Sequence, residues 1–187
     1  TNDKPVEQQK TANILKDSII IDGLTYRIKR YGKTYWMIDN LQVKKDHLGN
    51  IINFYLPDRN SNNIEVYGML YDYNTACKIC PNGWKLPNNV DWDELFLNNE
   101  NNAAIYKHEQ YWGESINTNL TKFSVKPSGY GNNGEHDNAF KNTSIFWSKT
   151  RNAEFAWTFI FEKNKSTIRK AEQHPTYAFS VRCVNKN

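Results

Sequence analysis

The fold is decided by the stretch Cys80-Pro81-Asn82-Gly83-Trp84-Lys85-Leu86-Pro87, which separates two predicted helices. Ahead of it, Asp72 or Asn74 can cap a short helix that runs to about Cys80, where Pro81 and Gly83 end it. Gly83 also permits a tight turn into the next segment. Trp84 is large enough to hold a helix against a sheet. The stretch therefore predicts a helix, a tight turn and a second helix that share one core.

The second helix is predicted to open at Pro87-Asn88. Asn88 as N-cap, with Asp91 three residues on, resembles a capping box in which Asp replaces Glu. The helix is expected to end near the Asn-rich residues 98–102. Its apolar face is supplied by Val90, Leu95 and Phe96, with Trp92 nearby.

Two tight hairpins are predicted ahead of the helices. Asp22-Gly23 lies between the β-forming residues 19–21 and 24–26, and an Asp-Gly pair suits a turn in which both central residues need positive φ. Gly32-Lys33 follows the same logic before residues 34–37. Residues 41–66 are interpreted as an irregular excursion with short strands at most.

Strands are also predicted near the end of the chain. Apolar residues alternate over 155–161 and again over 177–183, which favours half-buried antiparallel strands. Residues 163–165 turn the chain between strands. Residues 103–143 have no sustained period and are expected to be long loops interrupted by short strands. The order of elements predicts an α+β fold with antiparallel β-hairpins, two short α-helices and long loops.

Composition narrows the class of protein. The chain has 187 residues, a net charge of +4 and 14% aromatic residues, so wholesale disorder is excluded. No apolar run approaches the length of a membrane span. Positive and negative charges are interspersed, and no nucleic-acid partner is expected. The densest basic patch is interpreted as the solvated turn of a hairpin and consists of Lys163, Lys165, Arg169 and Lys170.

The chain is expected to hold one domain. Residues 1–16 are polar, have balanced charge and contain Pro5, so they are interpreted as a flexible leader or tether. Residues 17–187 form the single domain. Because the sequence starts at Thr1 rather than Met, its start is expected to be processed or engineered, and a signal peptide in a precursor is compatible with it.

Several motifs together resemble one known family, the Fibrobacter succinogenes major paralogous domain. The resemblance covers roughly 17–185 in the family's order. Its most specific motifs are C-P-x-G-W-x-L-P at 80–87 and F-S-V-R-C-V at 179–184. The other matching residues are Ile21-Asp22-Gly23, Tyr26, Gly32, Trp36-Met37, Asn40-Leu41, Tyr67-Gly68, Leu70-Tyr71, Trp92 and Phe146-Trp147-Ser148.

This resemblance carries expectations of its own. The family is similar to the C-type lectin-like fold, and it is typical of exported, often lipid-anchored surface proteins of Bacteroidetes and Fibrobacteres. The resemblance thus implies export, and membrane contact only through an N-terminal lipid anchor absent from this sequence. It also implies a Cys80–Cys183 disulfide that ties the first helix to the last strand, with Cys77 left as a buried, small hydrophobic residue.

Other residues are typical of redox or metal chemistry. Cys77 and Cys80 form a C-x-x-C, but both fall near a helix C-terminus, where the helix dipole disfavours a thiolate. The four His are scattered, which leaves zinc without a second ligand pair. Glu135-His136-Asp137 could ligate calcium from a loop, but a solvated turn is the favoured interpretation, and the calcium motifs of classical lectins are missing. No metal, cofactor or catalytic motif is expected.

The function predicted is a non-catalytic cell-surface module that binds glycan or protein. Its ligand site is expected on the loops between 108 and 138, because loops on a rigid scaffold carry binding residues. Stacking is assigned to Tyr111, Trp112 and Tyr130, and hydrogen bonding to Asn132, Asn133, Glu135 and Asp137. The rival explanation is that Trp112 and Tyr130 fold back as a satellite core. The alternative functions are a structural module of a surface assembly without a small ligand, and an enzyme on a related fold.

Overall fold

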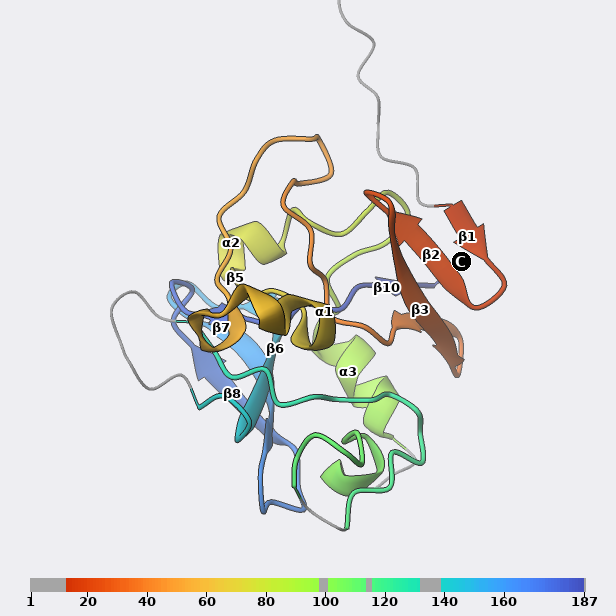
Figure 1. The fold of residues 1–187 in the computed structure, drawn as a ribbon, viewed down its shortest axis with the longest axis vertical. Helices are drawn as coiled ribbons and strands as arrows, with labels where there is room; N and C mark the ends of the chain where they lie inside the picture. The colour runs from red at the N-terminus through yellow and green to blue at the C-terminus, as the bar shows by residue number, and fades with distance from the viewer. Residues whose placement is uncertain (1–12, 98–100, 114–115, 132–138, 187) are drawn as a thin grey trace, which may run out of the picture.

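The computed structural model describes residues 13–97, 101–113, 116–131 and 139–186 (Figure 1). Its first sheet is antiparallel, has five strands and follows the order β1-β2-β3-β4-β10. The strands are β1 (Asn13–Leu15), β2 (Ser18–Ile21), β3 (Leu24–Tyr31), β4 (Thr34–Met37) and β10 (Val184–Asn185). Residues 13–15, which were predicted as part of a leader, therefore pair with β2 and belong to the sheet.

Both predicted hairpin turns are confirmed. Asp22 and Gly23 link β2 to β3 with φ of 51° and 78°, so both central residues adopt the left-handed region as expected. Gly32 has a φ of 57° at the first position of the turn between β3 and β4. These turns set the register of the pairs β2-β3 and β3-β4.

A second sheet has the order β6-β7-β8, and a third consists of β5 paired with β9. The strands are β5 (Tyr71–Asp72), β6 (Thr143–Arg151), β7 (Ala156–Glu162), β8 (Arg169–Gln173) and β9 (Ala178–Phe179). The strand predicted over 155–161 is confirmed as β7, but it is not half-buried. Ile160 lies in one core, whereas Phe159 and Phe161 lie in another, because the sheet separates the two.

The strand predicted over 177–183 is wrong in its extent. Only β9 forms within that range, β10 begins after it at Val184, and the chain between them crosses from one sheet to another. Phe179 pairs with Tyr71 of β5, and Val184 pairs with Trp36 of β4. Every residue from 178 to 184 is buried, so the polar positions of the alternating pattern face the interior as well. Periodicity alone cannot reveal this, because it records which residues are apolar and not what surrounds the polar ones.

The helices are short. They are α1 (Ile64–Tyr67), α2 (Tyr73–Ala76) and α3 (Asn89–Phe96), with 3-10 turns at η1 (Pro57–Arg59), η2 (Ser61–Asn63) and η3 (Ala103–Ile105). Asp72 caps α2 by accepting a hydrogen bond from the Thr75 amide at 2.9 Å, but the helix ends at Ala76 and not near Cys80. None of them is long and apolar enough to cross a bilayer among the residues described. The α+β class with few short helices is confirmed.

The capping box of α3 is confirmed. Asn88 accepts from the Asp91 amide, and the Asp91 carboxylate accepts from the Asn88 amide, both at 2.9 Å. Val90, which was assigned to the apolar face, is instead 58% exposed. Trp92 carries most of the contact, because its ring centroid lies 4.7 Å from that of Trp36 and 4.9 Å from that of Phe159. Figure 1 shows α3 between the first and second sheets, which this tryptophan joins.

The Cys80–Cys183 disulfide is confirmed, with 5.8 Å between the two Cα atoms. It links the segment after α2 to the residue before β10 across the larger core. The expectation that Cys77 is buried is wrong, since this free cysteine is exposed. Cys77 is the C-cap of α2, where the short helix has already left the core, so its side chain faces outward.

Candidate functional site

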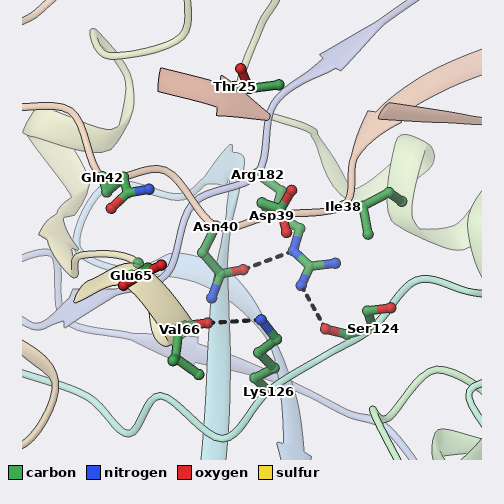
Figure 2. A pocket seen from close by; sticks show the side chains of 11 residues that line it. Thr25, Ile38, Asp39, Asn40, Gln42, Glu65, Val66, Ser124, Lys126 and Arg182 are labelled. Carbon is green, nitrogen blue, oxygen red and sulfur yellow. Dashed lines mark hydrogen bonds between the residues drawn. The ribbon is translucent and has the colours of Figure 1, made fainter. Parts of the chain in front are cut away.

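A polar pocket of about 230 Å³ opens between the end of β4, helix α1 and the segment 123–126 (Figure 2). We name it the charged pocket. It is lined by Thr25, Ile38, Asp39, Asn40, Gln42, Glu65, Val66, Gly68, Ser124, Lys126 and Arg182. Asn40, Gly68 and Arg182 belong to three separate motifs of the family resemblance, and the fold brings them together here.

Arg182 forms the floor of the charged pocket and is only 2% exposed. Its Nε donates to Asn40 Oδ1 at 2.8 Å, and its terminal nitrogens donate to the backbone carbonyls of Phe123 and Ser124. The guanidinium also lies 4.4 Å from the centre of the Phe123 ring. Burial lowers the pKa of Arg182 to about 9, so the group still carries its charge at neutral pH.

The backbone that receives Arg182 is strained. Lys122 and Ser124 have φ of 62° and 59°, a region that residues other than glycine rarely adopt. The Asn119 side chain holds Ser124 in place, because it accepts from the Ser124 amide and donates to its hydroxyl, both at 2.9 Å. This conformation turns two successive carbonyls toward one guanidinium. Neutral oxygens thus satisfy the buried cation.

Asn40 connects Arg182 to helix α1. Its amide nitrogen donates to the carbonyl of Tyr67 at 2.9 Å and to the Ser180 hydroxyl at 3.3 Å. The next residue, Gly68, has a φ of 76°, and a Cβ added there would lie 2.6 Å from Asn40 Cβ. Only glycine fits this close approach. The Arg182 node, which we define as Asn40, Gly68, Phe123, Ser124 and Arg182, is therefore fixed by backbone as well as side chains.

Asp39 forms its ion pair with Arg27 and not with Arg182. Its carboxylate accepts hydrogen bonds from the Arg27 side chain, the shortest at 2.6 Å, and from the Arg27 amide at 2.9 Å. Burial alone would raise the pKa of Asp39, but the hydrogen bonds from Arg27 outweigh it and hold the pKa below its ordinary value. Because Arg27 occupies both carboxylate oxygens, Asp39 does not form an ion pair with Arg182.

Lys126 is the second cation of the charged pocket. Its Nζ donates to the carbonyl of Val66 at 3.0 Å and lies 5.1 Å from the centre of the Tyr111 ring. Burial lowers the pKa of this lysine. Within the described residues, neither Lys126 nor Arg182 has a carboxylate in ion-pair distance. Figure 2 shows Asn40, Lys126 and Arg182 converging from three segments of the chain.

The rim of the charged pocket offers free polar groups. The side chains of Thr25, Gln42 and Glu65 form no hydrogen bond with any residue that the structure describes. Thr25 and Glu65 are exposed, and Gln42 is half-buried. A hydroxyl, an amide and a carboxylate are thus available to a ligand at the mouth of a pocket whose floor is rigid.

The predicted aromatic residues are not gathered in one site. Trp112 is 1% exposed, packs in the smaller core and donates from Nε1 to the carbonyl of Val125 at 2.8 Å, as the rival explanation held. Tyr111 is half-buried and meets Tyr67 edge-on, with 5.8 Å between ring centroids. Trp112 therefore supports the loops from beneath, and Tyr111 lies under Lys126 beside the charged pocket.

Tyr130 contributes to a separate cavity of about 340 Å³ on the second sheet, which we name the aromatic pocket. Tyr177 stacks on Phe179, with 6.0 Å between ring centroids, and Tyr130 meets Tyr177 edge-on at 6.2 Å. The pocket is lined by Tyr130, Ala139, Thr143, Ile145, Ile160, Glu162, Arg169, Gln173, Tyr177 and Phe179. The other predicted ligand residues, Asn132, Asn133, Glu135 and Asp137, lie outside the described residues.

The remaining chemical candidates form no further site among the described residues. No group of three or more His, Cys, Asp or Glu side chains within those residues is placed to hold a metal, and Glu135-His136-Asp137 lies outside them. Cys77 cannot act with Cys80 as a dithiol, because Cys80 is bonded to Cys183. Desolvation raises the pKa of the Cys77 thiol. In the basic patch, Arg169 and Lys170 pair with Glu162 and Asp93, as expected of a hairpin face.

Comparison with known proteins identifies the family of the chain. A family model described as the Fibrobacter succinogenes major domain matches residues 30–185. The chain belongs to this family. The matched part of this Fibrobacter succinogenes major domain contains the whole Arg182 node and both bonded cysteines, whereas Thr25 and Arg27 precede it. No curated protein and no solved structure matches the chain.

Sequence reasoning missed Arg182 and Lys126 as site residues. The motifs that contain Asn40, Gly68 and Arg182 entered the sequence analysis only through the family resemblance, without a role in a binding site. One signal was present, because an arginine within an apolar stretch must be satisfied by partners when that stretch is buried. Two of the partners of Arg182 are the backbone carbonyls of residues 123 and 124, which are far away in sequence. A pattern of side chains cannot predict them.

Proposed function

We propose that this domain is a non-catalytic carbohydrate-binding module of an exported protein. The observation that carries the proposal is the charged pocket, where Thr25, Gln42 and Glu65 present unpartnered polar groups above the rigid Arg182 node. Sugars are bound largely through hydrogen bonds to such hydroxyl, amide and carboxylate groups. A site fixed before binding loses little conformational entropy when its ligand arrives.

Export and surface location form part of the same proposal. The Cys80–Cys183 disulfide supports it, because structural disulfides persist in oxidising compartments. A lipid anchor upstream of residue 1 would attach the module to a membrane surface. We propose a C-type lectin-like relationship for the fold, supported by the disulfide between the segment after α2 and the residue before β10.

A protein partner is the second candidate, and one observation favours it. Leu48 and Ile51 are 58% and 87% exposed on a loop closed by a bridge between Lys45 and Ile51. Exposed apolar side chains that lie close together are typical of interaction surfaces. In this alternative the domain is an interaction module of a surface assembly, and the charged pocket has a structural role alone.

A glycan array with the oxidised protein tests the carbohydrate proposal. We expect at least one glycan to bind without being altered, and Gln42→Ala to weaken that binding by about tenfold, or ~1.4 kcal/mol. Tyr130→Ala in the aromatic pocket is the matched control and should leave the affinity unchanged. Loss of binding in Tyr130→Ala alone would move the site to the aromatic pocket. Absence of any bound glycan would refute the proposal and favour a protein partner.

A further inference from the structure

The charges at the charged pocket do not balance. Lys126 and Arg182 line it, Arg27 lies next to it through its contact with Asp39, and the Asp39 carboxylate is half-buried. Asp39 is already matched by Arg27. Glu65, the other carboxylate of the lining, is exposed at the rim. Lys126 and Arg182 thus leave an excess of positive charge at the floor.

This excess has a physical consequence for ligands. A charge in a medium of low dielectric acts over a longer distance than one in water, so a buried guanidinium projects a positive potential into the space next to it. Carbonyl oxygens satisfy the N–H groups of Arg182 but carry no net charge. Folding has already removed Arg182 from water. An anion that enters the pocket therefore interacts with this charge without any rearrangement of the pocket.

We propose that the charged pocket binds the carboxylate of an acidic sugar of the uronic acid class, which extends the carbohydrate-binding function proposed above and rests on it. Lys126 Nζ donates to the carboxylate, and the charge of Arg182 supports it from behind. Gln42 and Thr25 bind ring hydroxyls at the rim. The pocket of about 230 Å³ is smaller than the sites of drug-sized ligands, roughly 300–1,000 Å³, and suits one sugar ring.

A pair of matched ligands tests this inference directly. Methyl glucuronide and methyl glucoside differ at one carbon, which carries a carboxylate in the first and a hydroxymethyl group in the second. Titration calorimetry with the oxidised domain at low salt should show the glucuronide binding at least tenfold more tightly. The preference should shrink in concentrated salt, because mobile ions screen the charges that produce it.

Substitutions test whether the preference for the glucuronide depends on the side chain of Lys126. Lys126→Met should bring the two affinities within about twofold of each other, and Lys126→Arg should keep most of the difference. Lys33→Met, which removes an exposed charge from the turn between β3 and β4, should leave it unchanged. Far-ultraviolet circular dichroism and thermal melts of all three variants would separate a loss of charge from a loss of fold.

The outcomes distinguish this inference from the function on which it rests. If a neutral glycan binds and depends on Gln42, but the glucuronide has no advantage, the inference is overturned and carbohydrate binding stands. A preference that survives Lys126→Met also overturns it. If no glycan binds at all, both fall together.

Discussion

The two pockets of this domain are built in opposite ways. The charged pocket has a buried cation at its floor, and backbone carbonyls, a strained loop and an obligatory glycine hold that cation in place. The aromatic pocket is built from rings that pack on one another, with Tyr177 stacked on Phe179 and Tyr130 set edge-on. The first pocket depends on one conformation of several distant segments, whereas the second depends on contacts between neighbouring rings.

This difference separates two roles that a motif can have. Asn40, Gly68 and Arg182 come from motifs of the family resemblance, and they define the shape of the charged pocket rather than its mouth. The side chains free to meet a ligand, Thr25, Gln42 and Glu65, lie outside those motifs. A shared scaffold with separate rim residues can present different ligand chemistry without changing its fold.

The largest expected effect comes from Arg182→Met. It removes the donor for Asn40 Oδ1 and for the carbonyls of Phe123 and Ser124, which remain buried without a partner. We expect the free energy of unfolding in urea to fall by about 4 kcal/mol. Tyr177→Ala, the corresponding change in the aromatic pocket, should cost about 1 kcal/mol. Equal losses would show that the two pockets do not differ as described.

Removal of the disulfide should rank second. The double variant Cys80→Ala/Cys183→Ala opens a loop with a sequence separation of 103 and should lose about 3 kcal/mol, whereas Cys77→Ser should lose less than about 0.5 kcal/mol. Because Cys183 follows Arg182 directly, hydrogen exchange should rise more at Arg182 than at Phe159 in β7. A uniform rise would mean that the disulfide stabilises the whole domain evenly.

Gly68→Ala should have an intermediate effect. Its Cβ would lie 2.6 Å from Asn40 Cβ, and its φ of 76° with ψ of −163° suits glycine alone, so we expect a loss of about 2 kcal/mol. Gly23 has a similar φ of 78° but open space around it, so Gly23→Ala should cost about 1 kcal/mol. Melting temperatures of the two variants measure the contribution of the close contact. If both variants lower the melting temperature equally, backbone strain alone explains the loss and the close contact with Asn40 contributes nothing.

The smallest effect is the acid dependence of the charged pocket. The pKa of Asp39 is lower in the folded than in the unfolded protein, so its contribution is present above about pH 4 and is lost as the pH falls through the folded value. Asp39→Asn should flatten this part of the stability curve by at most about 1 kcal/mol, since Arg27 is 57% exposed. Asp93→Asn, at an exposed pair with Lys170, is the control and should leave the curve unchanged.

Local signals explain which parts of the fold the sequence predicts. The turn at Asp22-Gly23 and the capping box of Asn88 and Asp91 each depend on residues within a few positions, and both are confirmed. The disulfide follows from the family resemblance, and it is confirmed too. Sequence patterns predicted less well the features that depend on contacts between distant segments. The alternation over 177–183 predicted one strand, but that segment crosses between sheets, and the backbone acceptors of Arg182 within it lie at residues 123 and 124.

The candidate site shows the same limit. Tyr111, Trp112 and Tyr130 were grouped because they share a loop region, yet Trp112 fills a core and Tyr130 lines another pocket. Nearness in sequence does not determine which side of a loop faces solvent. Lys126 lies in that region too, but its role comes from the carbonyl of Val66 and from Arg182 behind it, which the fold alone brings near.

The disulfide also sets how far the domain can lengthen under load. A pull on the two ends of the described chain enters through β1 and β10, which lie at opposite edges of one sheet. If the domain unravels, the segment between Cys80 and Cys183 stays closed, and the extended chain is shorter by roughly 350 Å than after reduction. The bond therefore limits the length of the unravelled chain, a quantity that optical-trap extension curves can measure with and without reductant.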